Sequence, residues 1–182
     1  VPLPWETCIT MNNHWGYCAA DAQWKSPKSI VRKLVECVSK GGNLLLNVGP
    51  NARGEIPGES AAILGEVGAW MKMNADSIYG CKPSQLPKPE WGYLTQKDNV
   101  LFVHIFDGNF GPTAIDISPD RTARVRLLAS GSELQPIDSW ATSLWNDRLF
   151  INFGEDPIAS YPLPDYIDTV VKIVLDDSDG KN

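Results

Sequence analysis

Residues 26–50 read SPKSIVRKLVECVSKGGNLLLNVGP, and this stretch indicates a helix followed by a buried strand. Ser26 suits the N-cap of a helix, and Pro27 suits the first helical position. Apolar residues at helical spacing follow, namely Ile30, Val31, Leu34, Val35 and Val38. The glycine pair at 41–42 ends the helix. Residues 43–48 are then a short apolar run, typical of a strand buried on both faces.

The flanking residues extend this pattern into an α/β unit. Residues 1–25 are irregular and are interpreted as the end of a strand followed by a long loop. Residues 51–58 form a turn-rich loop. A second amphipathic helix is predicted at about 59–73, with its inward face made of Ile63, Leu64, Val67, Trp70 and Met71. Helix, strand and helix in this order are typical of a (β/α) barrel or a doubly wound sheet. A whole (β/α)8 barrel needs about 200 residues or more, so residues 1–82 are expected to be only part of one.

The pattern changes after residue 82. Three prolines mark a linker at 83–90. Residues 91–182 then alternate short apolar segments with polar turns, which predicts an antiparallel β-sandwich domain. The candidate strands are 91–95, 100–106, 113–117, 123–128, 140–144, 149–153 and 169–175. The polar residues 176–182 are expected to be a frayed end.

Composition excludes several classes of protein. The chain has 182 residues, 43% of them hydrophobic and 21% charged, which is ordinary for a globular protein. Its net charge of −6, without a basic cluster, argues against nucleic acid or an anionic membrane surface as partner. No apolar run approaches the roughly 20 residues of a spanning helix. Residues 1–4 have no features of a signal peptide.

The cysteines and histidines show no metal pattern. The four cysteines form no CxxC pair, and the two histidines lie far apart in sequence, so no metal and no cofactor is expected. The scattered cysteines are expected to be reduced thiols.

Residues 5–18 carry the candidate chemistry. Glu6 follows an indole, and nine residues later comes a second indole, Trp15, in a Trp-Gly-Tyr turn. Sugar rings stack on indoles, and a glycosidic oxygen needs a proton donor, so the stretch suits a carbohydrate site. A core aromatic cluster, with Glu6 at a helix start or in a salt bridge, is the alternative that composition leaves open.

The ordered motifs of residues 4–82 resemble the retaining α-L-fucosidases, glycoside hydrolase family 29. The matching pieces are Trp5-Glu6-Thr7-Cys8, Trp15-Gly16-Tyr17, Lys25-Ser26, Gly41 to Pro50, Gly54 to Pro57, Gly68-Ala69-Trp70 and Ile78-Tyr79-Gly80. The resemblance implies hydrolysis of terminal α-L-fucosyl linkages in oligosaccharides or glycoconjugates. It also implies that the chain is a C-terminal piece of the catalytic barrel followed by a β-sandwich, with the remainder of the barrel as partner.

Retaining glycosidases need a carboxylate nucleophile and an acid/base carboxyl about 5 Å apart. The resemblance places the nucleophile in a Trp-Asn-Asp motif upstream of Glu6, hence outside this chain. Trp145-Asn146-Asp147 lies in the β-rich part and is interpreted as a turn. Glu6 is the candidate acid/base, with a supporting role through hydrogen bonds as the alternative.

Trp15 matches the aromatic residue that packs against the C5-methyl face of fucose in this family, and His14 is a further candidate substrate contact. We expect Glu6 and Trp15 to lie together at the carboxyl ends of the strands. Asn47 ends the predicted buried strand, where it could orient a loop or make a structural hydrogen bond.

Two other functions stay open. A non-catalytic carbohydrate-binding or structural module would use Trp140 or Trp145 on the sandwich, and a different retaining glycosidase could share the same barrel ending. The sequence leaves linkage preference, oligomeric state and compartment undetermined.

Overall fold

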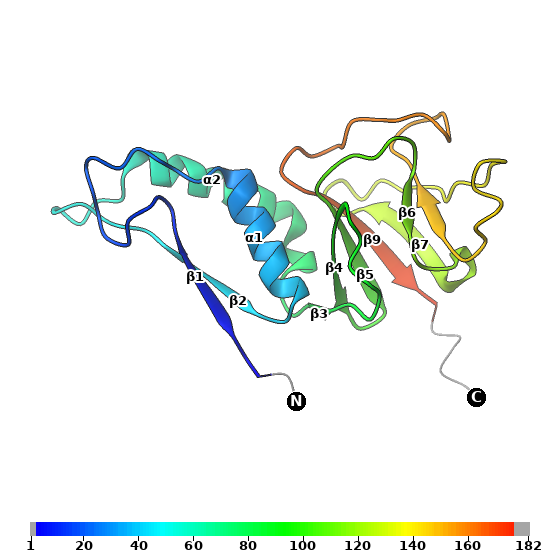
Figure 1. The fold of residues 1–182 in the computed structure, drawn as a ribbon, viewed down its shortest axis with the longest axis horizontal. Coiled ribbons are helices and arrows are strands. Elements are labelled where there is room, and N and C mark those ends of the chain that lie inside the picture. The colour runs from blue at the N-terminus through cyan, green and yellow to red at the C-terminus, as the bar shows by residue number, and fades with distance from the viewer. Residues whose placement is uncertain (1–2, 177–182) are drawn as a thin grey trace.

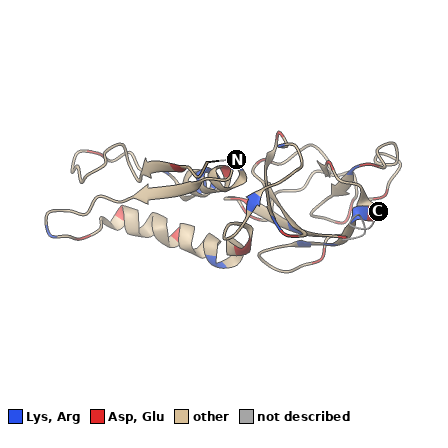
Figure 2. Ribbon diagram, turned by 90° about the horizontal axis from the view of Figure 1, so that it is seen from below, with Lys and Arg blue, Asp and Glu red and all other residues tan. Residues whose placement is uncertain are grey.

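The computed structural model describes residues 3–176 and consists of two adjoining parts (Figure 1). The first part contains two parallel strands and two helices, and the second part is built from antiparallel strands. The polar end expected at 176–182 lies, apart from Asp176, outside the described residues. Figure 2 shows acidic and basic residues scattered over both parts. None of the described helices is long and apolar enough to cross a bilayer.

The first part follows the predicted order. Its elements are β1 (Glu6–Thr10), α1 (Pro27–Ser39), β2 (Asn43–Asn47), α2 (Gly58–Asn74) and a 3-10 turn, η1 (Ala75–Ser77). β1 and β2 are parallel, with Glu6 opposite Asn43 and Thr10 opposite Asn47. Both strands therefore end at the same edge, as in a (β/α) unit. The prediction that the strand after α1 is buried on both faces is wrong: Asn43 and Leu45 are exposed, because among the described residues the helices cover only one face of the β1–β2 pair.

Helix α1 begins and ends as the sequence predicts. The Ser26 hydroxyl accepts a hydrogen bond from the Ser29 backbone N–H at 3.1 Å, which caps the helix. Gly41, with φ of +77°, terminates it. The next residue, Gly42, has no room for a side chain, because the Trp5 ring lies against it and a Cβ there would stand 2.3 Å from the ring. The Trp5 indole N–H donates to the Lys40 carbonyl at 3.3 Å, so this indole packs at the end of α1.

The second part holds a five-stranded sheet in the order β3-β4-β5-β9-β7 and a two-stranded sheet, β6-β8. Both sheets are antiparallel. The strands are β3 (Lys82–Pro83), β4 (Gly92–Lys97), β5 (Val100–Ile105), β6 (Thr113–Ile115), β7 (Thr122–Leu127), β8 (Leu149–Ile151) and β9 (Thr169–Leu175), with a 3-10 turn, η2 (Pro119–Arg121), before β7. Six of the seven predicted strands are present.

One prediction for this part is wrong. Residues 140–144 form turns rather than a strand, because they lack the alternating burial that pairing requires and Trp140 and Leu144 point to solvent. The expected linker begins with β3, which pairs with β4 through Pro83 and Thr95. The assignment of 1–82, 83–90 and 91–182 as separate units stays a prediction.

Strand β5 has side chains buried on both faces of its sheet. Leu101, Val103 and Ile105 join the core between the two sheets, which Ile115 of β6 and Leu149 of β8 complete. Phe102 points the other way, into an apolar cluster with Val31 and Val35 of α1 and Trp70 of α2. The five-stranded sheet is therefore covered by β6-β8 on one face and by the helices on the other.

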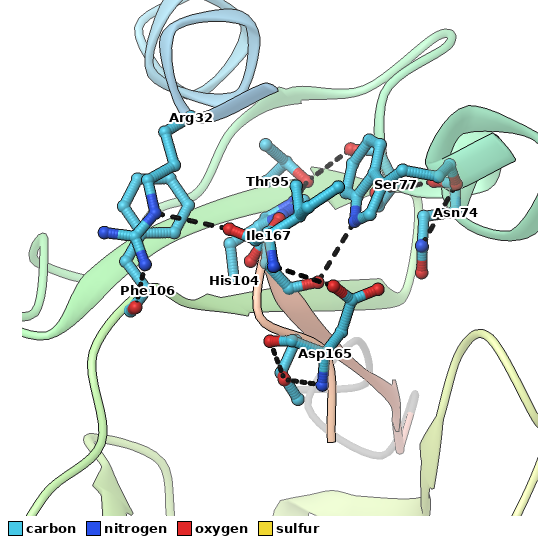
Figure 3. A network of polar contacts seen from close by, with 11 residues as sticks. Arg32, Asn74, Ser77, Thr95, His104, Phe106, Asp165 and Ile167 are labelled. Carbon is cyan, nitrogen blue, oxygen red and sulfur yellow. Dashed lines mark hydrogen bonds and ion pairs between the residues drawn. The ribbon is translucent and has the colours of Figure 1, made fainter. Parts of the chain in front are cut away.

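A buried polar network lies within this second cluster (Figure 3). His104 Nδ1 contacts Asp168 Oδ2 at 2.6 Å, and both side chains are fully buried. The Trp70 indole N–H of α2 donates to the Asp168 carbonyl at 3.1 Å. On the other side of His104, the Thr95 hydroxyl lies 3.2 Å from Nε2 and donates to the Ser77 carbonyl at 2.7 Å. Burial raises the pKa of the Asp168 carboxyl, and His104 opposes that rise.

Arg32 of α1 makes a second polar junction with the sheet. Its guanidinium donates to the Phe106 carbonyl and, at 3.2 Å, to the Ile167 carbonyl, and it contacts Asp107 at 3.2 Å. It also lies over the Phe106 ring, 4.6 Å from the ring centroid. Helices and sheet are thus joined by directional bonds as well as by apolar packing.

We predict that His104→Ala lowers the free energy of unfolding by about 3 kcal/mol, because it leaves Asp168 buried without its partner. Denaturant unfolding followed by circular dichroism measures this. Glu36→Gln is the control: Lys33 and Lys40 lower the pKa of Glu36 to about 2, but the group lies at the surface. Its loss should cost less than about 1 kcal/mol. Equal effects of the two substitutions would contradict a structural role for the buried pair.

Candidate functional site

The candidate site lies at the edge where β1 and β2 end. Two loops leave this edge, residues 11–24 after β1 and residues 48–57 after β2. Asn47, the last residue of β2, donates from its side-chain amide to the Trp15 carbonyl at 2.5 Å. It also accepts a hydrogen bond from the Met11 N–H at 3.1 Å through its own carbonyl. Asn47 therefore orients the loop that carries Trp15, one of the two roles that the sequence left open.

Gly49 allows the two loops to touch. A Cβ at this position would stand 2.7 Å from the Gly16 carbonyl carbon and 2.7 Å from the Tyr17 nitrogen. Both neighbours are backbone atoms, so a side chain at Gly49 would displace the Trp-Gly-Tyr turn. This contact explains why glycine stands before Pro50 in the Leu-Asn-Val-Gly-Pro stretch.

Lys25 and Asp21 hold the far end of the same loop. The Lys25 ammonium donates to the Asn12 carbonyl at 2.6 Å, and the Lys25 N–H donates to the Met11 carbonyl at 2.9 Å. The Asp21 carboxylate accepts hydrogen bonds from the Asn13 N–H at 2.8 Å and the Gln23 N–H at 3.0 Å. It also contacts His14 Nδ1 at 2.6 Å. The hydrogen bonds of His14 and of the Gln23 N–H hold the pKa of Asp21 below its usual range.

A cavity of about 150 Å³ lies between the two loops. Its walls combine aromatic, small and polar residues, among them Asn12, Tyr17, Asp21, Trp24, Gly49 and Glu59. Trp15 lies outside its lining, with 57% of its surface exposed, and Tyr17 is similarly exposed. An exposed indole beside a polar hollow can stack on the apolar face of a sugar while the hollow binds hydroxyl groups.

The structure separates Glu6 from Trp15, which corrects our expectation that they lie together. Glu6 is the first residue of β1 and lies opposite Asn43, the first residue of β2, so it is at the amino ends of the strands. Four residue steps, or about 13 Å of strand, separate it from the edge where Trp15 is held. Its neighbour Trp5 packs at that amino end against Gly42 and Lys40. The short distance between Glu6 and Trp15 in the sequence does not reveal this separation, because the separation depends on the residue at which β1 begins.

The other aromatic candidates lie in the second part of the chain. Trp145-Asn146-Asp147 falls in the turns before β8, as predicted, with the Trp145 ring 6.3 Å from that of Phe150. Trp140 projects to solvent with 81% of its surface exposed. The described residues contain no group of three or more His, Cys, Asp or Glu side chains placed to hold a metal ion. All four cysteines are free thiols.

Three residues of the cavity wall were not predicted from the sequence, namely Asn12, Asp21 and Glu59. These residues lie on irregular loops and at a helix start, where no periodic pattern indicates which polar side chains line a cavity. The one available signal is Asp21 itself, a carboxylate seven residues after His14 within a stretch rich in Trp and Gly.

Comparisons with known proteins agree on one family. The sequence model described as α-L-fucosidase matches residues 1–76. Tissue α-L-fucosidase of Bos taurus is 35% identical over 163 residues, which cover 87% of this chain and 34% of that protein. The matching family model, this relative and the matching solved structures are all α-L-fucosidases.

Solved structures of α-L-fucosidases share its fold. Isoenzyme 1 from Paenibacillus thiaminolyticus is 53% identical with a TM-score of 0.91, and the match covers 97% of this chain and 41% of that one. An α-fucosidase from Thermotoga maritima, in complex with a mechanism-based inhibitor, is 29% identical with a TM-score of 0.74 and coverage of 94% and 40%. The chain therefore spans about two fifths of these α-L-fucosidases and about a third of the bovine relative.

We predict that Gly49→Ala disturbs the site, because its Cβ would collide with the Gly16 and Tyr17 backbone. In the full-length protein, cleavage of the 11–24 loop by chymotrypsin should become several-fold faster. Gly68→Ala, in the middle of α2 with no atom within 4 Å of its Cβ, is the matched control. It should leave cleavage unchanged and stabilise the helix by about 0.5–1 kcal/mol. Unchanged cleavage in Gly49→Ala would show that the two loops are not in tight contact.

Proposed function

We propose that this chain forms part of an enzyme that hydrolyses terminal α-L-fucosyl linkages of oligosaccharides or glycoconjugates. The observation that carries the proposal is the exposed Trp15 at the carboxyl ends of two parallel strands, where Asn47 bonds to its backbone carbonyl and Gly49 packs against the following residues of the turn. In (β/α) barrels this edge carries the active site. Fucose is a 6-deoxy sugar, and its methyl group favours an aromatic wall over a polar one.

We propose residues 1–82 as a portion of the catalytic barrel and 91–182 as a β-sandwich domain. The outer edges of β1 and β2 lack strand partners among the described residues, and Leu45 is 40% exposed. Neighbouring barrel strands would satisfy these backbone groups and cover the apolar side chain. The remainder of the barrel is therefore the partner we propose for this face.

The mechanism we propose is double displacement with retention of configuration. One carboxylate attacks the anomeric carbon while a second carboxyl group protonates the leaving oxygen; water then cleaves the fucosyl-enzyme. A mechanism-based inhibitor in the Thermotoga relative is compatible with a covalent step. We place the nucleophile outside this chain, because Asp147 lies in the sandwich turns and Glu6 lies at the wrong end of β1.

The direct test is hydrolysis of 4-nitrophenyl α-L-fucoside by the full-length protein, with the matching β-D-galactoside and α-D-mannoside as controls. Proton NMR of the first-formed sugar distinguishes retention from inversion. Absence of α-L-fucoside hydrolysis would overturn the proposed function, and a β-anomer formed first would overturn the retaining mechanism.

Trp15→Ala should mainly weaken substrate binding in the full-length protein. The loss of a ring face against a methyl group should cost roughly 1–3 kcal/mol, which raises KM by about 5- to 150-fold. Phe110→Ala removes another fully exposed aromatic ring, on the sandwich, and is the control. Steady-state kinetics with aryl α-L-fucoside measure both. A fall in kcat at constant KM would argue that Trp15 supports the fold of the site rather than the sugar.

The position of Glu6 favours the supporting role over that of acid/base. Glu6→Gln should then lower turnover of aryl and natural fucosides alike, by less than about tenfold, and azide should restore nothing. An acid/base would behave differently: its loss spares substrates with good leaving groups in the first step, and azide replaces the missing general base. Selective loss on natural fucosides together with azide rescue would return Glu6 to the catalytic residues.

Trp140 supports a second candidate function, carbohydrate binding by the sandwich. Trp140 lies in the turn segment 139–147, and its ring is almost fully exposed. Exposed aromatic rings of this kind can stack on sugars. Co-precipitation of the full-length protein with insoluble fucosylated polysaccharide tests this candidate. Trp140→Ala should abolish retention without changing hydrolysis of a small aryl fucoside; retention equal to that of the wild type would exclude this candidate.

A further inference from the structure

Asp21 is the one carboxylate of the 11–24 loop, and both of its oxygens are hydrogen-bonded. Its side chain is only 3% exposed. Oδ1 accepts from the Gln23 N–H, and Oδ2 accepts from the Asn13 N–H. Oδ2 also contacts His14 Nδ1 at 2.6 Å. A buried carboxylate that accepts backbone N–H groups at these distances is held in one orientation.

This arrangement determines the proton position on His14. A carboxylate with these bonds is ionised and can only accept, so His14 Nδ1 must carry the hydrogen. In the neutral ring Nε2 is then an acceptor, and it lies on the opposite side of the imidazole from Asp21. The His14 side chain is 57% exposed, so the ring is anchored through Nδ1 and accessible elsewhere.

The anchored residue is also next to Trp15 in the loop. His14 immediately precedes Trp15, whose carbonyl is held by Asn47, and the His14 N–H donates to the Asn12 side chain at 3.3 Å. The backbone on both sides of His14 is therefore bonded to neighbouring groups. A histidine that only filled space would not need a buried carboxylate on one nitrogen while the other faces outward.

We propose that Asp21 is a positioning residue that sets the tautomer and orientation of His14, so that His14 Nε2 accepts a hydrogen bond from a hydroxyl group of the bound sugar. The inference rests on the proposed function, since the ligand is the fucosyl residue that stacks on Trp15. His14 contacts the substrate, and Asp21 acts through it.

A double-mutant cycle in the full-length protein separates positioning from a merely structural role. KM and kcat for aryl α-L-fucoside are measured for the wild type, His14→Ala, Asp21→Asn and the double variant. His14→Ala should raise KM about three- to tenfold, the effect of one lost neutral hydrogen bond, with kcat nearly constant. Asp21→Asn alone should raise KM by the same factor as His14→Ala. Added to His14→Ala, it should raise KM by less than a further twofold.

The matched control is Asp156→Asn on the sandwich. Asp156 likewise accepts a backbone N–H, that of Ile158 at 3.0 Å, and the substitution makes the same chemical change. It should leave KM unchanged. If Asp21 only braces the loop through Asn13 and Gln23, Asp21→Asn will cost as much in the His14→Ala background as in the wild type, and the additive cycle will overturn the inference.

The proton on His14 provides a readout that does not require activity. Histidine-selective 15N labelling, with the His14 signals assigned by His14→Ala, should show Nδ1 protonated and Nε2 bare at high pH. A protonated Nε2 would overturn the inference even if Asp21→Asn failed to fold.

The kinetic outcomes separate this inference from the proposed function. A wild type that hydrolyses no α-L-fucoside overturns the function. A wild type that hydrolyses it, with KM unchanged in His14→Ala, overturns the inference alone.

Discussion

The packing of both faces of strand β5 is the constraint on which the rest of the structure depends. Its odd-numbered residues complete the core between the two sheets, and Phe102 and His104 complete the layer under the helices. A polar ring in that apolar layer requires a partner, and Asp168 of the adjoining strand segment supplies it at 2.6 Å. Through Asp168 and Thr95 the pair extends to Trp70 of α2 and to Ser77, so a single buried network fixes how the helices sit on the sheet.

The candidate site lies at the opposite end of the helical part, and different interactions hold it. Neither of the two apolar clusters of the described residues includes a residue of the 11–24 loop. Short polar bonds from Asn47, Lys25 and Asp21, together with the close approach at Gly49, give it its shape. Such a loop can present exposed aromatic and imidazole groups to a ligand while the rigid strands and helices behind it keep their positions. Stability and recognition are thus divided between the two ends of the first part.

The elements that were predicted correctly are those with strong local signals. Helix α1 has its capping serine, its proline and a five-residue apolar face, and six strands have alternating or apolar runs between turns. Residues 140–144 were predicted wrongly as a strand because a tryptophan, a threonine and a leucine resemble strand composition, whereas none of the described strands pairs with them. At the site, Trp15 was expected at the carboxyl ends of the strands and lies there. Glu6 was expected at the same ends, but it lies at the amino end of β1. Asp21 was not predicted, because its burial arises from hydrogen bonds within an irregular loop that has no periodic pattern in the sequence.

The sequence by itself determined the order of helices and strands, the caps of α1, and the ordered motifs that relate the chain to the α-L-fucosidases. These features depend on neighbours within a few residues, or on the linear order of motifs, and both can be read from the chain. The tertiary structure decided which end of β1 each candidate residue occupies, which loops touch at Gly49, and which carboxylate orients which imidazole. Those relations depend on strand register and on close contacts between segments up to 37 positions apart. A small difference in where a strand begins moves a side chain from one end of the sheet to the other.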